Sequence, residues 1–118
     1  MAQAVRLRRR AEFQRVYTDG IKVVGRFVVL FFVRGEESVC RLGVTVTRRI
    51  GNAVVRNRAR RRIRELVRRD GEAVAGLYGD LVINARRGVN EVAWSELEED
   101  FTRCLGKVRR RGGSGGQP

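Results

Sequence analysis

Residues 48–69 read RRIGNAVVRNRARRRIRELVRR, and they carry the strongest pattern in the chain. Asn52 is a good helix N-cap, and the apolar residues after it recur at helical spacing, which predicts a helix over 53–69. With about 3.6 residues per turn, the apolar side chains fall within roughly 120° of arc, and they are Val55, Ala59, Ile63, Leu66 and Val67. We expect this face to pack on a sheet.

The opposite face of this helix is positively charged. Residues 48–69 contain ten arginines and a single acidic residue, Glu65. The polar residues opposite the apolar stripe are Asn57, Arg60, Arg61, Arg64 and Arg68. Arginines four residues apart repel each other, at a cost of about 0.2–0.5 kcal/mol per pair in a free helix. Folding does not require that cost, so the row predicts a polyanionic partner, and nucleic acid is the partner that fits.

The composition of the whole chain points the same way. The 118 residues include 26 Lys+Arg and 13 Asp+Glu, for a net charge of +13, and all the basic residues except Lys22 and Lys107 are arginines. Arginine grips phosphate with two parallel hydrogen bonds and stacks on bases, which lysine does not do. The absence of His excludes His-based acid–base chemistry and His-ligated metals. Cys40 and Cys104 form no CxxC pair, and we interpret them as reduced core thiols of a cytosolic protein.

Several other classes of protein are excluded or disfavoured by the sequence. The longest apolar run, 27–33, is far too short for a membrane span, and the N-terminus lacks the apolar segment of a secretory signal. No carboxylate stands next to a candidate nucleophile or metal ligand, and no Walker-type phosphate loop is present. We therefore predict no catalytic residue and no metal ligand in this chain.

The remaining patterns predict one α+β domain over residues 1–111, with a mixed sheet and a basic, irregular segment at 1–10. Residues 112–118 are rich in glycine and are expected to be a disordered tail. The elements expected in between are a helix over 11–18, strands over 26–34 and 39–47 with a hairpin loop at 35–38, a strand over 80–85, a turn over 90–93, and a helix from 95 to about 109.

Local signals refine these expectations. The strand over 26–34 is β-branched and aromatic, which is typical of burial on both faces. Gly43 is expected to weaken or bend the second strand. Gly76 and Gly79 bracket a linker before the third strand. Finally, Ser95 and Glu98 have the spacing of a capping box at the start of the last helix.

Residues 48–65 closely resemble the signature of the bacterial ribonuclease P protein component, in which a similar RNR run lies on the second helix. Three other segments support the resemblance. The segment RRAEFQRVY at 9–17, followed by Gly20, looks like the opening helix of that family. The segment RLGVTV at 41–46 looks like its strand before the basic loop, and DLVINARR at 80–87 looks like its last strand with a trailing basic pair. The match covers roughly residues 7–109.

The resemblance implies a fold and a function. The fold is an α/β sandwich like the second domain of ribosomal protein S5, with a left-handed βαβ crossover. The function is that of the small RNA-binding subunit of ribonuclease P, the endoribonuclease that removes the 5′ leader from precursor tRNA. In that family the RNA subunit is the catalyst and uses Mg²⁺, while the protein binds the leader and strengthens the affinity for substrate and Mg²⁺. The implied partners are the catalytic RNA and precursor tRNA, in the cytoplasm, with no membrane, no obligate protein partner and no metal held by the protein alone.

Two sets of site residues follow from the resemblance. The first set meets the catalytic RNA and comprises Arg56, Asn57, Arg58, Arg60, Arg61 and Arg64, to which the charged face of the helix adds Arg68. The second set lines a cleft for the single-stranded leader and comprises Phe13, Tyr17, Arg48, Arg49, Arg86 and Arg87. The family often places a further cleft tyrosine on the first strand, where this chain offers either Leu30 or Phe31. The alternative for Phe13 and Tyr17 is that both belong only to the core.

Two other functions compete with this interpretation. A ribosomal or general RNA-binding protein would share the basic charge, the missing His and the sandwich fold, although it would not need the RNR run together with an aromatic first helix. A membrane-active basic helix is the second alternative. The apolar stripe of 55–67 argues against it, because the stripe lacks Trp and Phe and is interrupted by Arg62.

Overall fold

In a computed structural model, which describes residues 5–113, the centre of the protein is a mixed five-stranded sheet of order β1-β4-β5-β3-β2. Strand β3 runs antiparallel to both of its neighbours, β2 and β5, while β4 is parallel to β5 and to β1. The strands are β1 (Val5–Arg6), β2 (Ile21–Val24), β3 (Val28–Arg34), β4 (Cys40–Thr45) and β5 (Gly79–Ala85). The mixed sheet predicted from the sequence is confirmed.

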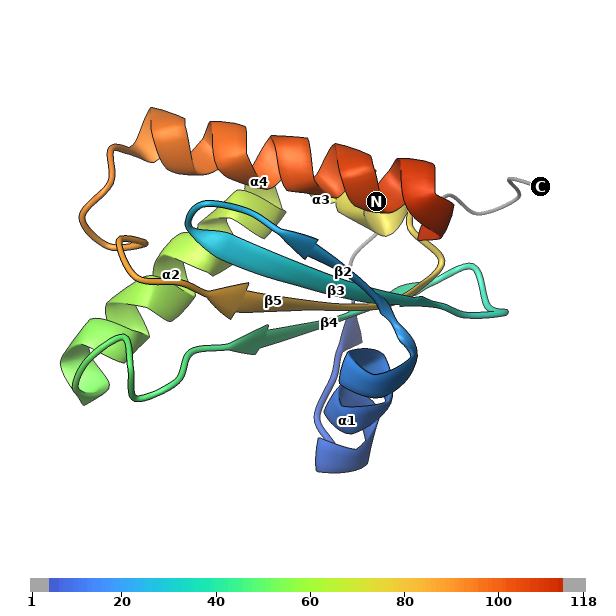
Figure 1. Ribbon diagram of the computed structural model, residues 1–118. Helices are drawn as coiled ribbons and strands as arrows, with labels where there is room; N and C mark the ends of the chain where they lie inside the picture. The colour runs from blue at the N-terminus through green and yellow to red at the C-terminus, as the bar shows by residue number, and fades with distance from the viewer. Residues whose placement is uncertain (1–4, 114–118) are drawn as a thin grey trace.

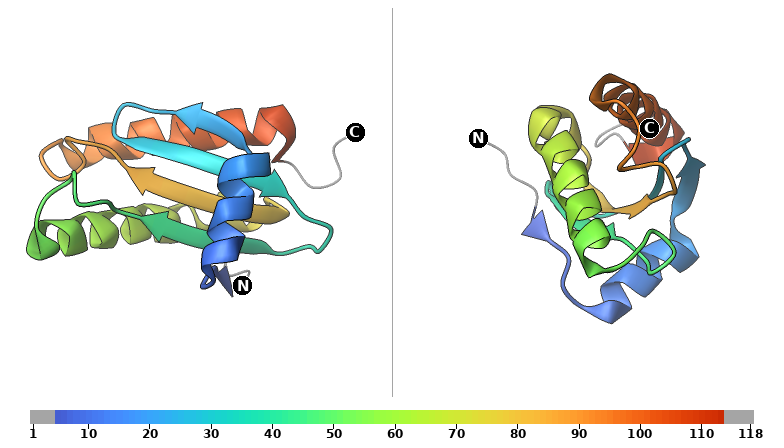
Figure 2. Two further views of the ribbon diagram at one scale, coloured as in Figure 1. Left: turned by 60° about the horizontal axis from the view of Figure 1, so that its bottom comes forward. Right: turned by 90° about the vertical axis from the view of Figure 1, so that its left-hand side faces the viewer.

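Helices cover both faces of the sheet, as Figures 1 and 2 show. The helices are α1 (Arg10–Asp19), α2 (Ala53–Arg69), α3 (Gly71–Ala75) and α4 (Trp94–Val108), and a π-helical turn, η1 (Arg109–Gly113), follows α4. Helices α2 and α4 lie on one face, and α1 crosses the other. The main core lies between the sheet and α2 and α4, and a smaller cluster of Leu7, Val16 and Val82 lies under α1.

The βαβ connection from β4 through α2 to β5 has the rare, left-handed crossover. In Figure 2 (left), α2 lies behind the sheet, β4 lies below β5, and both arrows point left. With these parallel strands turned to point up, β5 stands to the right of β4 with the helix behind, which is a left-handed crossover. About 98% of such connections are right-handed. The crossover implied by the family resemblance is therefore present.

The two long helices form as their patterns predict. Asn52 Oδ1 accepts a hydrogen bond from the Val55 amide at 3.0 Å and caps the start of α2. Ala59, Ile63 and Leu66 of α2 are fully buried against the sheet. The apolar stripe of α4 is buried in the same core through Leu97, Phe101, Cys104, Leu105 and Val108.

The sheet differs from the predicted one in its edges and its order. No strand was predicted at 21–24, and residues 5–6 lie in the segment predicted to be irregular. Both segments nevertheless pair in the sheet, as β2 and β1 respectively. Each is too short to display an alternating pattern. The hairpin expected at 35–38 is wrong, because β5 lies between β3 and β4 and hydrogen-bonds to both.

Several local features of the structure also differ from those predicted. A short helix that was not predicted, α3, lies between the end of α2 and the predicted linker bracketed by Gly76 and Gly79. The capping box is wrong, because α4 begins at Trp94 with Ala93 as its N-cap and no side-chain cap. Strand β3 is fully buried on one face only, since Val29 and Phe31 are half-buried. Of the predicted tail, the first two residues lie in η1, and 114–118 lie outside the described residues.

Candidate nucleic-acid interface

The outer face of α2 presents the predicted row of arginines to solvent. Arg58, Arg61 and Arg64 are exposed. Within residues 5–113, Arg58 and Arg61 make no hydrogen bond or ion pair. Arg56 donates to the Gly51 carbonyl at 2.9 Å, and Arg60 donates to the side chain of Asn57 at 3.0 Å. Neither contact neutralises a charge, so this part of α2 keeps its full positive charge on the surface.

The C-terminal end of the row is different. Arg68 makes two hydrogen bonds to the Glu65 carboxylate, Nε–Oε1 at 2.9 Å and Nη2–Oε2 at 2.6 Å. Arg69 also contacts Glu65, at 3.3 Å. The two guanidinium groups, Arg68 foremost, lower the pKa of Glu65 to about 2. Among the predicted RNA contacts on α2, Arg68 is thus the one whose charge is paired with an acidic residue within 5–113.

Arg62, which interrupts the apolar stripe, has a structural role. Its Nη1 donates to the Val89 carbonyl at 2.6 Å and to the Val92 carbonyl at 3.0 Å. Its guanidinium also lies 5.6 Å from the centre of the Trp94 ring. The side chain therefore ties α2 to the loop before α4, and its position within the stripe was the signal that it faces inward.

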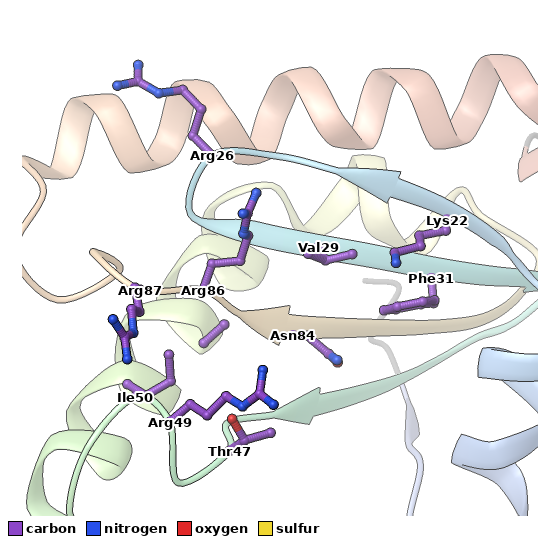
Figure 3. Close-up of a pocket in the computed structure, with 11 residues that line it drawn as sticks. Lys22, Arg26, Val29, Phe31, Thr47, Arg49, Ile50, Asn84, Arg86 and Arg87 are labelled. Carbon is purple, nitrogen blue, oxygen red and sulfur yellow. The ribbon is translucent and has the colours of Figure 1, made fainter.

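The face of the sheet that α1 leaves open holds a groove of about 450 Å³ (Figure 3). Among the described residues that line it, five are basic and none is acidic. The groove begins at the loop after β4, passes the end of β5 and reaches β3 and β2. Its lining consists of Lys22, Arg26, Val29, Phe31, Thr47, Arg49, Ile50, Asn84, Ala85, Arg86 and Arg87. Apolar and polar sheet residues thus form its floor, and cations surround it.

Tyr17 of α1 stands over the sheet beside this groove. Its hydroxyl lies 3.0 Å from both Asn84 Oδ1 and Thr45 Oγ1, on β5 and β4. Its ring meets Phe31 edge-on, with centroids 4.8 Å apart, and 37% of the residue stays exposed. Of the two first-strand candidates, Phe31 lines the groove, whereas Leu30 is fully buried in the main core.

The other predicted cleft residues are placed less uniformly. Arg49 and Arg87 are exposed on the groove, and Arg86 is anchored there by a 2.5 Å hydrogen bond to the Gly25 carbonyl. Arg48 is exposed but is not part of the lining. Phe13 is half-buried in the small cluster under α1 and does not line the groove either.

Several lining residues were not anticipated from the sequence. Lys22, Thr47 and Asn84 come from three separate segments, and only the strand pairing brings them to one surface. The usable signal was the alternation in 39–47 and 80–85, which places their polar side chains on the face away from the main core.

An ion-pair network fixes α1 across the sheet. Arg41 on β4 makes two hydrogen bonds to the buried Asp80 of β5, at 2.9 and 2.8 Å. The same guanidinium binds Glu12 of α1 at 2.6 Å. Glu12 also accepts hydrogen bonds from the Arg9 and Arg8 amides, and these bonds, with Arg41, hold its pKa below the usual value. Glu12 and Asp80, for which the sequence suggested no function, therefore position α1 through Arg41.

Residues 5–113 contain no group of three or more His, Cys, Asp or Glu arranged to hold a metal ion. Among the helices within this range, none has the length and apolar character needed to cross a membrane. Cys40 and Cys104 are free and buried, as predicted.

Residues 1–109 match the family model described as Ribonuclease P. The chain belongs to the ribonuclease P protein family. A ribonuclease P protein component from Gluconacetobacter diazotrophicus is 42% identical over 113 residues, covering 93% of this chain and 96% of the relative. The corresponding protein of Streptococcus mutans is 32% identical, and the match covers 89% of this chain and 87% of that relative.

Solved structures agree with this family assignment. The Staphylococcus aureus ribonuclease P protein superposes with a TM-score of 0.75 at 29% identity and covers 90% of this chain and 98% of its own. The Thermotoga maritima ribonuclease P protein superposes with a TM-score of 0.76 at 28% sequence identity. The match covers 87% of this chain and 96% of the Thermotoga maritima chain. As a ribonuclease P protein, the chain is a component of the tRNA-processing ribonucleoprotein and associates with its RNA.

Proposed function

We propose that this ribonuclease P protein holds two RNAs on two separate surfaces. The arginine row of α2 binds the catalytic RNA subunit, and the groove beside α1 binds the 5′ leader of precursor tRNA. In this proposal the RNA subunit hydrolyses the phosphodiester bond, and the protein supplies affinity and position in the cytoplasm, without a catalytic residue of its own.

The observation that carries the proposal is the chemistry of the groove. A single-stranded RNA needs cations for its phosphates and exposed rings for its unpaired bases. The groove offers five basic side chains, the Phe31 ring, and the exposed ring of Tyr17 against it. Both rings come from the ordered elements α1 and β3, so the stacking surface is formed before RNA arrives.

The placement of the two surfaces supports their separate roles. The arginine row lies on α2, which packs on the opposite face of the sheet from α1. The loop over 46–52 joins the two surfaces, since it supplies Arg49 to the groove and Asn52 to the start of α2. Catalytic RNA on α2 and a leader in the groove would therefore meet near this loop.

Mg²⁺ belongs to the RNA in this proposal. The described residues do not provide a group of three or more His, Cys, Asp or Glu that could hold the ion. The contribution of the protein to Mg²⁺ affinity would be indirect, through the position of the substrate on the RNA.

The test is the affinity of the assembled complex for precursor tRNA as a function of leader length, with and without Tyr17→Ala. One stacked base is worth about 1–3 kcal/mol, so long leaders should lose that much affinity. A one-nucleotide leader, which does not reach the groove, should lose none. The matched control is Tyr78→Ala, because Tyr78 is the other tyrosine of the chain and precedes β5, away from the groove lining.

An equal loss at every leader length, with the fold intact, would show that Tyr17 is only a core residue. Tyr17→Phe separates the ring from its hydroxyl. That variant should retain most of the affinity, since the ring remains, and any loss reports the hydrogen bonds to Thr45 and Asn84.

A further inference from the structure

The arginine-rich turn after α4 lies beyond both surfaces described above. Arg109, Arg110 and Arg111 of η1 are consecutive and exposed, with no acidic residue among them. Arg111 Nη1 donates to the Lys22 carbonyl at 3.1 Å. Lys22 lies on β2, the last strand of the sheet, so this contact places Arg111 at the open edge of the sheet. The C-terminal end of α4 lies beside β2 in Figure 1.

A continuous series of contacts joins this turn to the groove. The Tyr17 ring meets Phe31 with centroids 4.8 Å apart, and Lys22 Nζ lies 5.7 Å from the centre of the same Phe31 ring. Lys22 lines the groove with its side chain and meets Arg111 with its carbonyl. Lys22 in the groove and Arg111 beyond the edge strand β2 are therefore adjacent basic residues.

We propose that η1 binds the phosphates of the 5′-distal part of the leader, where it leaves the groove across β2. This inference rests on the proposed function of the groove. The direction follows from the placement of the two surfaces: the groove end at Arg49 adjoins the start of α2, where the catalytic RNA would lie, so the cleavage site belongs at that end. The distal nucleotides then run toward Lys22 and Arg111.

The width of the sheet sets the leader length that this contact requires. From β4 to β2 the leader crosses three strand spacings of about 4.8 Å each, or about 14 Å in total. At about 3.4 Å per stacked nucleotide, the groove holds about four nucleotides. Tyr17, which contacts β3, β4 and β5, should be reached before Arg111. The two contacts should therefore begin at different leader lengths.

The experiment measures precursor tRNA affinity of the complex with catalytic RNA, using leaders of about two, five and ten nucleotides, which bracket the roughly four-nucleotide groove. Arg110→Ala with Arg111→Ala should weaken binding of the longest leader roughly two- to twenty-fold, as expected for two exposed phosphate contacts. The two shorter leaders should bind unchanged. Tyr17→Ala should already weaken binding at the middle length. The charge-matched control is Arg8→Ala with Arg10→Ala, at the opposite edge of the sheet.

Each outcome decides the inference. A loss confined to the longest leader supports it, and the unchanged affinity for short leaders shows that the variant is folded. An equal loss at all lengths would overturn it, because η1 would then contact the catalytic RNA or the tRNA body. No loss at any length would also overturn it. In either of these two outcomes, the groove proposal stands if the affinity loss caused by Tyr17→Ala still depends on leader length. If that loss does not depend on leader length either, the groove proposal and the η1 proposal both fail.

Discussion

Gly43→Ala should dislodge α1 from the sheet, because Gly43 is the position on which the Phe13 ring rests. A Cβ at residue 43 would lie 2.5 Å from Phe13 Cε2 and 2.7 Å from Cζ. Carbon atoms prefer separations of about 3.5–4.0 Å, so the ring must retreat by about 1 Å. The glycine therefore makes room for the Phe13 ring, a role that its sequence context did not indicate.

Such overpacking lowers the free energy of unfolding by about 1–3 kcal/mol. For a domain of about this size, each kcal/mol lowers the melting temperature by about 4 °C or more. The matched control is Gly71→Ala, because a Cβ there meets nothing within 4 Å. Thermal or urea unfolding of the two variants beside the wild type measures the difference, and the control should be neutral or slightly stabilising.

The same substitution should also affect RNA binding on one surface only. Tyr17 lies one turn beyond Phe13 on α1, so a displaced ring moves the tyrosine away from Thr45 and Asn84. Affinity for long leaders should fall, while affinity for the catalytic RNA on α2 should hold.

A smaller partner should rescue the variant. Phe13→Leu combined with Gly43→Ala should be more stable than the sum of the two single changes predicts, by on the order of 1 kcal/mol. Strict additivity, or a Gly43→Ala protein as stable as the wild type, would refute the assignment of Phe13 as the anchor of α1.

Three further predictions address charge and thiols. Arg58→Ala with Arg61→Ala should weaken assembly with the catalytic RNA. The slope of the logarithm of the binding constant against the logarithm of the salt concentration should become shallower by about one unit per lost phosphate contact. An unchanged slope would mean that these side chains contact no phosphate. Glu65 has its pKa lowered to about 2 from 4.5, so its stabilising charge is complete above pH 4.5 and is lost as the pH falls toward 2. The melting-temperature deficit of Glu65→Gln should therefore shrink over that range, and a constant deficit would contradict the ion pair. Burial raises the pKa of Cys40 to about 12 and that of Cys104 to about 11, so both thiols should react slowly in the folded protein, and replacing either with Ala should preserve cleavage by the complex under reducing conditions.

Helices were predictable in this chain where the pattern was long enough to be unambiguous. The stripe from Val55 to Val67 and its Asn52 cap define α2 locally, because a helix is built from contacts three and four residues apart. Strand β2 spans four residues and contains Lys22, so it displays no clear alternation. Its existence depends on pairing with β3, which local sequence does not encode.

The roles of individual arginines were less predictable than their number. Arg58 and Arg62 lie in the same arginine-rich segment of the sequence, whereas Arg41 lies between the apolar residues Cys40 and Leu42. In the structure, Arg41 is held by Asp80, Arg62 is held by two loop carbonyls, and only Arg58 is exposed without a partner within the described residues. These distinctions depend on residues 27 to 39 positions away along the chain, which composition and helical periodicity do not report.

The insertion of β5 between β3 and β4 has a consequence for the protein during its synthesis. The two strands that β5 joins are completed by Thr45, but their shared neighbour ends only at Ala85. Until that segment leaves the ribosome, β2–β3 and β1–β4 are two ribbons with exposed backbone edges, and isolated two-stranded ribbons are marginally stable at best. The arginine row of α2 emerges during this interval. Its repulsion from other nascent chains would discourage pairing of those edges until β5 closes the sheet.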